Sequence, residues 1–311
     1  MPHYIIAGAP GTGKSVYVRK RLSETPGCTL LFTADTTSDK RENLRVDFNH
    51  PAGFLSGLES IWRMRAAADV ARLLTALIFP GASVDSPGLA HYRHLSQECL
   101  RASVLVLREC NIPLSADNLS DLLEHAEAGI PHLPQLSKRT RETFEEAARR
   151  EPGGLLPRMV LLSKQSAKAV AALEFSGATP AAIAWEDVLR PSASTTFVTP
   201  SPLGGNPYHW TSTLLLRLAQ VGRERARLGW PASAEKTRVI LDEYHHETDG
   251  FAAQQLLNAA DEGGFQVFLV VQEYSNGIPD TIDGFEVVHV NHPIAKARGL
   301  VEADSPFVET N

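Results

Sequence analysis

One eight-residue stretch near the start of the chain constrains its fold more than any other feature. The stretch reads Gly8-Ala9-Pro10-Gly11-Thr12-Gly13-Lys14-Ser15 and matches the pattern G-x-x-x-x-G-K-S/T. The apolar residues 4–7 precede it and predict a buried strand, and residues 16–22 can continue as a helix. Strand, glycine-rich turn and helix form the context in which this pattern binds phosphate groups. The stretch therefore predicts an α/β fold with a nucleotide at the junction of its first strand and first helix.

Each part of this motif has a separate role in binding. The glycines allow backbone N–H groups to curl around the β- and γ-phosphates, and the helix N-terminus adds positive potential. Lys14 would reach the oxygens of these phosphates, and the Ser15 hydroxyl would bind Mg²⁺. Because glycine makes up about 7% of residues in proteins, a chance match in a chain of this length has odds of roughly one in a hundred. We therefore predict a magnesium nucleotide as the ligand.

The composition is that of an ordinary globular protein. The chain has 311 residues, of which 43% are hydrophobic and 21% charged, enough for one large or two ordinary domains. The net charge of −6 argues against a basic surface overall, but a nucleic-acid groove needs only local Lys and Arg. The cysteines lack C-x-x-C spacing and predict reduced thiols rather than a disulfide or zinc framework: Cys28, Cys99 and Cys110.

The hydrophobic pattern predicts a cytoplasmic location. No apolar run approaches the length of a transmembrane helix. The first predicted strand begins almost at once, which leaves no room for a signal peptide. We expect any membrane association to come through a partner protein.

The predicted elements fall into an α/β group and an all-α group. Strands are expected at 4–7, 28–33, 44–48, 195–199, 237–241, 265–271 and 285–290, with helices at 211–228 and 251–260. Helical periodicity fills the middle of the chain, with helices expected at 58–79, 91–110, 118–128, 137–150 and 155–175. We therefore predict a discontinuous sheet domain, residues 1–52 and 177–311, interrupted by an all-α domain, residues 53–176.

A carboxylate pair late in the chain would complete the nucleotide site. The apolar residues 239–241 run into Asp242 and Glu243. This order would place Asp242 on the metal and Glu243 beside the γ-phosphate, as the base or orienter of the attacking water. Gln272 ends the strand 265–271. In hydrolases with an added strand between the phosphate-loop strand and the Asp-Glu strand, a polar residue there senses the γ-phosphate, although strand-terminal polar residues also simply face solvent.

Other polar groups give weaker signals. His245 and His246 lack further ligands at the spacing that a metal site requires, and we expect them in a solvated loop. Three basic groups could contact the phosphates of a polymer, although such clusters on helices are usually solvated faces: Arg19-Lys20-Arg21, Lys138-Arg139-Arg141 and Arg223-Arg225-Arg227.

The order of these parts resembles the HerA/FtsK superfamily of DNA-pumping ATPases. Within it, the cytoplasmic domains of conjugative and type IV secretion coupling proteins are most similar, because an all-α domain interrupts their motor domain in the same way. The matching pieces are residues 8–15, the helical block 53–176, residues 239–243 and residues 265–272. The resemblance implies a RecA-like P-loop NTPase fold of the additional-strand, catalytic-glutamate type, with a mostly parallel sheet flanked by helices.

The resemblance also implies an activity and an assembly. Lys14, Glu243 and Gln272 would act in the hydrolysis of ATP with Mg²⁺, and subunits would form a hexameric ring that drives DNA through a central channel. Membrane-bound secretion, phage or conjugation proteins would be its partners.

Three features depart from the pattern of these coupling proteins. Their arginine finger commonly lies about eleven residues before the glutamine, where this chain has Asp261. Arg298, Arg223, Arg225 or Arg227 could take that role. The motif Asp-Pro-Lys-Gly after their second strand is replaced by Asp35-Thr36-Thr37-Ser38, and their N-terminal membrane anchor does not precede the first strand.

Two other functions stay open. A nucleotide-gated assembly or regulatory protein with weak turnover would explain Asp261 at the finger position. A P-loop small-molecule kinase is the other possible function, although the helical insertion and the late Asp242-Glu243 pair are unusual for a kinase.

Overall fold

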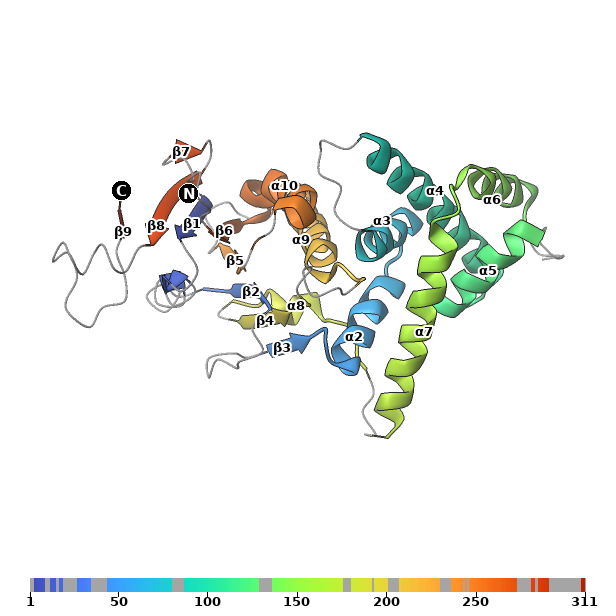
Figure 1. Cartoon of the computed structure of the whole chain (residues 1–311), viewed down its shortest axis with the longest axis horizontal. Helices are drawn as coiled ribbons and strands as arrows, with labels where there is room; N and C mark the ends of the chain where they lie inside the picture. The colour runs from blue at the N-terminus through green and yellow to red at the C-terminus, as the bar shows by residue number, and fades with distance from the viewer. Residues whose placement is uncertain are drawn as a thin grey trace.

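A nine-stranded sheet lies at one end of the protein and a block of helices at the other (Figure 1). The computed structural model describes residues 3–8, 12–14, 17–18, 27–34, 44–79, 87–128, 136–175, 180–191, 193–200, 207–229, 236–242, 244, 246–272, 281–282, 285–290 and 309–310. The strands are β1 (His3–Gly8), β2 (Thr29–Thr33), β3 (Leu44–Asp47), β4 (Ser194–Val198), β5 (Thr237–Leu241), β6 (Phe265–Gln272), β7 (Thr281–Ile282), β8 (Phe285–Val290) and β9 (Glu309–Thr310).

The strand order confirms the predicted fold class. The order is β3-β4-β2-β5-β6-β1-β8-β7, and β9 also pairs with β8. Every neighbouring pair from β3 to β8 is parallel, whereas β7 and β9 run antiparallel to β8. All predicted strands are present. The two-residue strands β7 and β9 were not predicted, because so short a segment carries no periodic pattern.

The added strand expected from the sequence is β6. It lies between β1 and β5, so that Gly8 pairs with Gln272 on one side and Leu241 pairs with Leu269 on the other. Parallel pairing brings the carboxyl ends of the three strands to one edge of the sheet. Ligands of open α/β sheets bind at that edge.

The described helices are α2 (Pro51–Trp62), α3 (Ala67–Ile78), α4 (Pro87–Glu109), α5 (Ala116–Ala128), α6 (Lys138–Arg150), α7 (Leu155–Glu174), α8 (Trp185–Val188), α9 (Trp210–Arg227) and α10 (His246–Gly263). The prediction of one helix over 58–79 was wrong, because the chain breaks between α2 and α3. Arg108 of α4 donates to the carbonyls of Met64 and Arg65 in this break. Both helices bury an apolar face, so the apolar spacing continues across the break and conceals it.

Composition led to two further predictions, one on the cysteines and one on membrane-spanning helices. Cys28 and Cys99 are buried, Cys110 is partly buried, and all three are free thiols, as predicted. None of the described helices is both long enough and apolar enough to cross a bilayer.

Alternate side chains of the central strands enter two hydrophobic clusters. In β6, Phe265, Val267 and Leu269 belong to the larger cluster, and Phe268 and Val270 to the smaller one. Such alternation places the two sets on opposite faces of the sheet. Helices α9 and α10 lie on the face of the sheet that carries the larger cluster. They pack closely at two glycines, since a Cβ on Gly263 would lie 2.5 Å from the Cα of Gly222.

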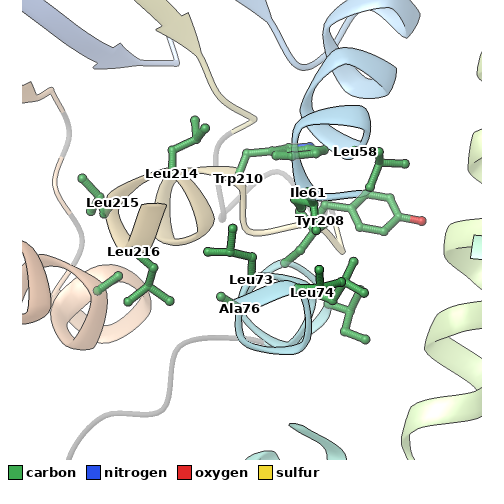
Figure 2. Close-up of a cluster of buried hydrophobic side chains, with 14 of the residues drawn as sticks. Leu58, Ile61, Leu73, Leu74, Ala76, Tyr208, Trp210, Leu214, Leu215 and Leu216 are labelled. Atoms are coloured by element: carbon green, nitrogen blue, oxygen red, sulfur yellow. The ribbon is translucent and has the colours of Figure 1, made fainter. Parts of the chain in front are cut away.

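The larger cluster continues from the sheet into the helical block. Trp210, at the start of α9, stacks on Phe48 with ring centroids 4.5 Å apart and meets the edge of Phe54 at 5.6 Å. Gly57 of α2 makes room for it, because a Cβ there would lie 2.5 Å from the indole. Figure 2 shows the indole beside Leu58 and other apolar side chains of α2 and α3. Helices α2 and α3 therefore share a core with the sheet, and the division into domains at residues 53 and 176 stays a prediction.

Replacing Trp210 with alanine is expected to lower the free energy of unfolding by about 3–5 kcal/mol, because a fully buried aromatic side chain would leave a cavity. Its Nε1 has no hydrogen-bond partner among the described residues, so Trp210→Phe should retain most of the stability. Urea unfolding of the variants measures the difference. Tyr92→Ala is the control, because its side chain is 51% exposed and its loss should change stability by about 0.5 kcal/mol at most. A loss below about 1 kcal/mol for Trp210→Ala would contradict this account.

Candidate nucleotide-binding site

The predicted site residues that the structure describes gather at the carboxyl edge of the central strands. Gly8 ends β1 and pairs with Gln272, which ends β6. Asp242 follows Leu241, the last residue of β5. The N–H of Tyr244 donates to the carbonyl of Val270 at 3.0 Å, so the chain after β5 stays beside β6. Two segments more than 200 positions apart in the sequence therefore meet at one edge of the sheet.

The described part of the phosphate loop shows why it requires glycines. Gly13 has a φ of 87°, a left-handed conformation that L side chains rarely adopt. A Cβ on Gly8 would lie 2.4 Å from the carbonyl oxygen of Val290 and 2.7 Å from the Oγ1 of Thr12. The N–H of Tyr17 donates to the Gly13 carbonyl at 2.8 Å, so the first helix begins directly after the loop. The N–H groups of a first helical turn are the donors that bind anions at helix N-termini.

The side chain of Lys14 folds back and binds the end of β1. Its Nζ donates to the carbonyl oxygen of Gly8 at 2.7 Å, which joins the end of β1 to the first helical turn. The side chain is half-buried, so its ammonium lies against the loop rather than extended into solvent. This position places a positive charge where the motif predicts the β- and γ-phosphates.

Asp242 is held at the same edge by the neighbouring strand β2. Its N–H donates to the carbonyl of Phe32 at 2.9 Å, and its Oδ2 accepts a long hydrogen bond of 3.5 Å from the Thr33 hydroxyl. Thr33 is only 3% exposed and was not among the predicted site residues. Its position at the end of a strand is the signal that could have identified it. Hydrogen bonds of this kind orient the carboxylates that bind metal ions.

The donor set suits Mg²⁺ better than a metal held by protein alone. Among the described residues, no group of three or more His, Cys, Asp or Glu side chains could hold a metal ion. Mg²⁺ usually keeps several waters and binds one or two carboxylates together with phosphate oxygens. The carboxylate of Asp242, beside the described part of the phosphate loop, fits this pattern.

Several residues singled out in the sequence lie outside the described part of the chain, and the statements about them stay predictions: Ala9, Pro10, Gly11, Ser15, Arg19, Lys20, Arg21, Asp35, Glu243, His245 and Arg298. For Gln272 and His246 the backbone is described and the side chain is not.

Two of the positions considered for an arginine finger lie at the opposite edge of the sheet. Asp261 of α10 is exposed and pairs with Lys236, which precedes β5, at 3.2 Å. Arg225 of α9 lies 5.4 Å from the ring centroid of Phe265, the first residue of β6. Burial lowers the pKa of the Arg225 guanidinium. Arg225 therefore packs against the amino ends of the strands and not at the candidate nucleotide site.

The glycine loop after β1, the carboxylate after β5 and the strand between them define the fold of additional-strand P-loop NTPases. Neither a protein-family model nor a curated protein matches the sequence. Solved structures do match.

The bacterial conjugative coupling protein TrwBdeltaN70, in its unbound monoclinic form, gives a TM-score of 0.53 at 15% identity, over 87% of this chain and 62% of that chain. The plasmid coupling protein TrwB with ADP and Mg²⁺ gives 0.53 at 15% identity, over 87% and 64%. TrwB with the non-hydrolysable ATP analogue ADPNP gives 0.52 at 14% identity, over 87% and 64%. The chain thus spans 62–64% of the length of these coupling-protein structures. At such identities the likeness concerns the fold, and at that level it confirms the resemblance to coupling proteins.

Proposed function

We propose that the protein binds ATP with Mg²⁺ at the carboxyl ends of β1, β5 and β6 and hydrolyses it. One observation carries the proposal: Lys14 lies within a glycine loop at a helix N-terminus, while Asp242 lies at the same edge beyond an added strand. The nucleotides in the similar TrwB structures, ADP with Mg²⁺ and an ATP analogue, support this choice of ligand.

Each site residue has a role in this proposal. Lys14 and the loop amides bind the β- and γ-phosphates, and Ser15 and Asp242 hold the metal, with Thr33 orienting Asp242. When bound, Mg²⁺ neutralises negative charge that develops on the phosphate oxygens. Glu243 accepts a proton from the attacking water or orients it. Gln272 ends the added strand opposite Gly8, where its amide is suited to sense the γ-phosphate.

We also propose that hydrolysis drives the translocation or transfer of DNA, as in the coupling proteins. The fold similarity covers 87% of this chain, more than the sheet and its flanking helices alone. In this proposal about six subunits form a ring in the cytoplasm. Membrane-bound proteins of a secretion, phage or conjugation apparatus would recruit it.

A second candidate is a nucleotide-gated assembly protein with weak turnover. The exposed Asp261, paired with Lys236, occupies the position where coupling proteins commonly carry the arginine finger. Loss of such an arginine can lower the rate of hydrolysis by roughly 10³–10⁵. Binding of ATP would then matter more than its hydrolysis.

Phosphate release with and without DNA separates the two candidates. The motor should release phosphate faster when DNA is added, and light scattering should show growth to about six subunits with an ATP analogue and DNA. Single- and double-stranded DNA are compared to define the substrate. Near-background turnover, unchanged by DNA, together with a nucleotide-dependent change in size, would instead support the assembly protein. Phosphate transfer to a metabolite without DNA dependence would support a kinase.

A further inference from the structure

Two basic residues meet at the C-terminal end of α3, where the sheet layer meets the helical block. Arg158 of α7 donates from Nη1 to the carbonyl of Ile78 at 2.6 Å, and its guanidinium lies 4.6 Å from the ring centroid of Phe79. His209, just before α9, donates its backbone N–H to the carbonyl of Leu77 at 2.9 Å. The side chain of Arg158 and the backbone of His209, 51 positions apart in the sequence, therefore bind the same helix end.

Arg93 of α4 is the third basic group of this cluster. The positive charges of Arg93 and Arg158 both act on the imidazole of His209. Burial, followed by these two charges, lowers the pKa of His209 to about 4, so the imidazole is neutral at neutral pH. Burial also lowers the pKa of Arg93. All three side chains are half-buried.

The cluster lacks a counter-charge among the described residues. No carboxylate in the described ranges forms an ion pair with Arg93, Arg158 or His209, and Arg93 forms no hydrogen bond there. Other arginines of the helical block are paired with a glutamate or aspartate on their own helix: Arg63 with Glu59, Arg72 with Asp69, Arg101 with Glu98 and Arg150 with Glu146.

Partly buried like charges without an anion are unfavourable, because they lose hydration and repel one another. The carbonyls at the end of α3 satisfy part of the hydrogen-bonding capacity of Arg158. No hydrogen bond joins these carbonyls to Arg93 among the described residues. A bound anion would supply the counter-charge that Arg93 lacks there.

We propose that Arg93, Arg158 and His209 form a second phosphate-binding site, separate from the phosphate loop. Figure 1 shows α9 between the strands β1 and β6 on one side and the helices α3, α4 and α7 on the other, so the two sites lie apart. Guanidinium groups bind phosphate oxygens in a bidentate manner, and the imidazole adds a further donor. The phosphate can belong to a nucleic-acid backbone or to a small molecule.

Residues that flank Arg93 in the sequence, on neighbouring faces of α4, favour the nucleic-acid backbone. His91, Tyr92 and His94 are exposed on the same helix, and Tyr92 exposes 51% of its surface. Exposed aromatic rings beside cationic groups are typical of surfaces that bind single strands by stacking bases and contacting phosphates. The inference does not depend on ATP hydrolysis at the first site.

The first test measures sulfate binding by calorimetry at low ionic strength, with Lys14→Ala as the background to weaken binding at the phosphate loop. Sulfate mimics phosphate and keeps its charge between pH 5 and pH 8. Arg93→Gln should weaken sulfate binding about tenfold, the loss expected for one charge-assisted hydrogen bond. Arg149→Gln is the matched control, because Arg149 is exposed on α6 and its replacement changes the net charge equally. Equal affinities in the two variants would overturn the proposal.

A single-stranded oligonucleotide then identifies the source of the phosphate. If the ligand is a nucleic-acid backbone, Arg93→Gln should weaken oligonucleotide binding more than Arg149→Gln does. Tyr92→Ala, added to Arg93→Gln, should then weaken that binding further. If the ligand is a small molecule, Arg93→Gln should weaken sulfate binding alone. Either result supports a phosphate site and assigns its source.

The titration of His209, followed by NMR, reports on the contact itself. The groups that act on its imidazole are Arg93 from α4 and Arg158 from α7, and both disfavour its protonated form. A bound anion should therefore raise the pKa of His209 from about 4, and sulfate affinity should increase as the pH falls through the new value. An unchanged His209 pKa at saturating sulfate would exclude His209 from the site.

Discussion

Replacement of Lys14 by alanine is expected to lower the rate of ATP hydrolysis by about a hundredfold to a thousandfold, the loss seen when one pre-positioned donor to a developing charge is removed. The Nζ of Lys14 lies 2.7 Å from the carbonyl oxygen of Gly8, inside the loop that would hold the phosphates. The Lys14 ammonium would need to move little to leave this carbonyl and bind phosphate oxygens instead. Phosphate release at saturating ATP and Mg²⁺ measures the effect.

Lys138→Ala is the matched control for this variant. Its side chain on α6 is 88% exposed and makes only a long contact of 3.7 Å with Glu142. The control should hydrolyse ATP at the rate of the unchanged protein. Thermal unfolding should be similar for both variants, because neither residue belongs to the hydrophobic core. Turnover by Lys14→Ala within about threefold of the unchanged protein would contradict the proposed site.

Replacement of Glu243 by glutamine is expected to lower turnover by about 10²–10⁴ while ATP binding is retained. Glutamine keeps the size of the side chain and removes the group that can accept a proton from water. The residue follows Asp242, whose backbone the Phe32 carbonyl holds at the site edge. Single-turnover hydrolysis gives the rate, and equilibrium binding of labelled ATP gives the affinity.

Glu262→Gln removes an exposed carboxylate from α10 and serves as the control for this second variant. It should leave both the rate and the affinity unchanged. A Glu243→Gln protein that loses ATP binding together with turnover would assign Glu243 to binding instead of water activation. A Glu243→Gln protein that keeps its full rate would exclude the proposed role. If the predicted result is found, this variant holds ATP unhydrolysed and is suited to measuring nucleotide-dependent assembly.

Much of the fold could be predicted because its signals are local. The strand before the phosphate loop, the left-handed glycine at position 13 and the strand that ends before Asp242 each depend on neighbouring residues. Helical periodicity also located most helices of the block between β3 and β4. It missed the break between α2 and α3, because the apolar spacing continues across it. Only the tertiary structure brings Arg108 of α4 to the carbonyls there.

The sequence by itself therefore determined the elements and the chemistry at their ends. Which elements lie side by side was decided only in the tertiary structure. The order of strands placed β6 between β1 and β5, brought Thr33 to Asp242, and left Arg225 at the opposite edge of the sheet. Packing of α3 against α4, α7 and α9 gathered Arg93, Arg158 and His209. The physical reason is that backbone dihedral preferences and apolar spacing act over a few residues, whereas strand pairing and helix packing join residues far apart in the chain.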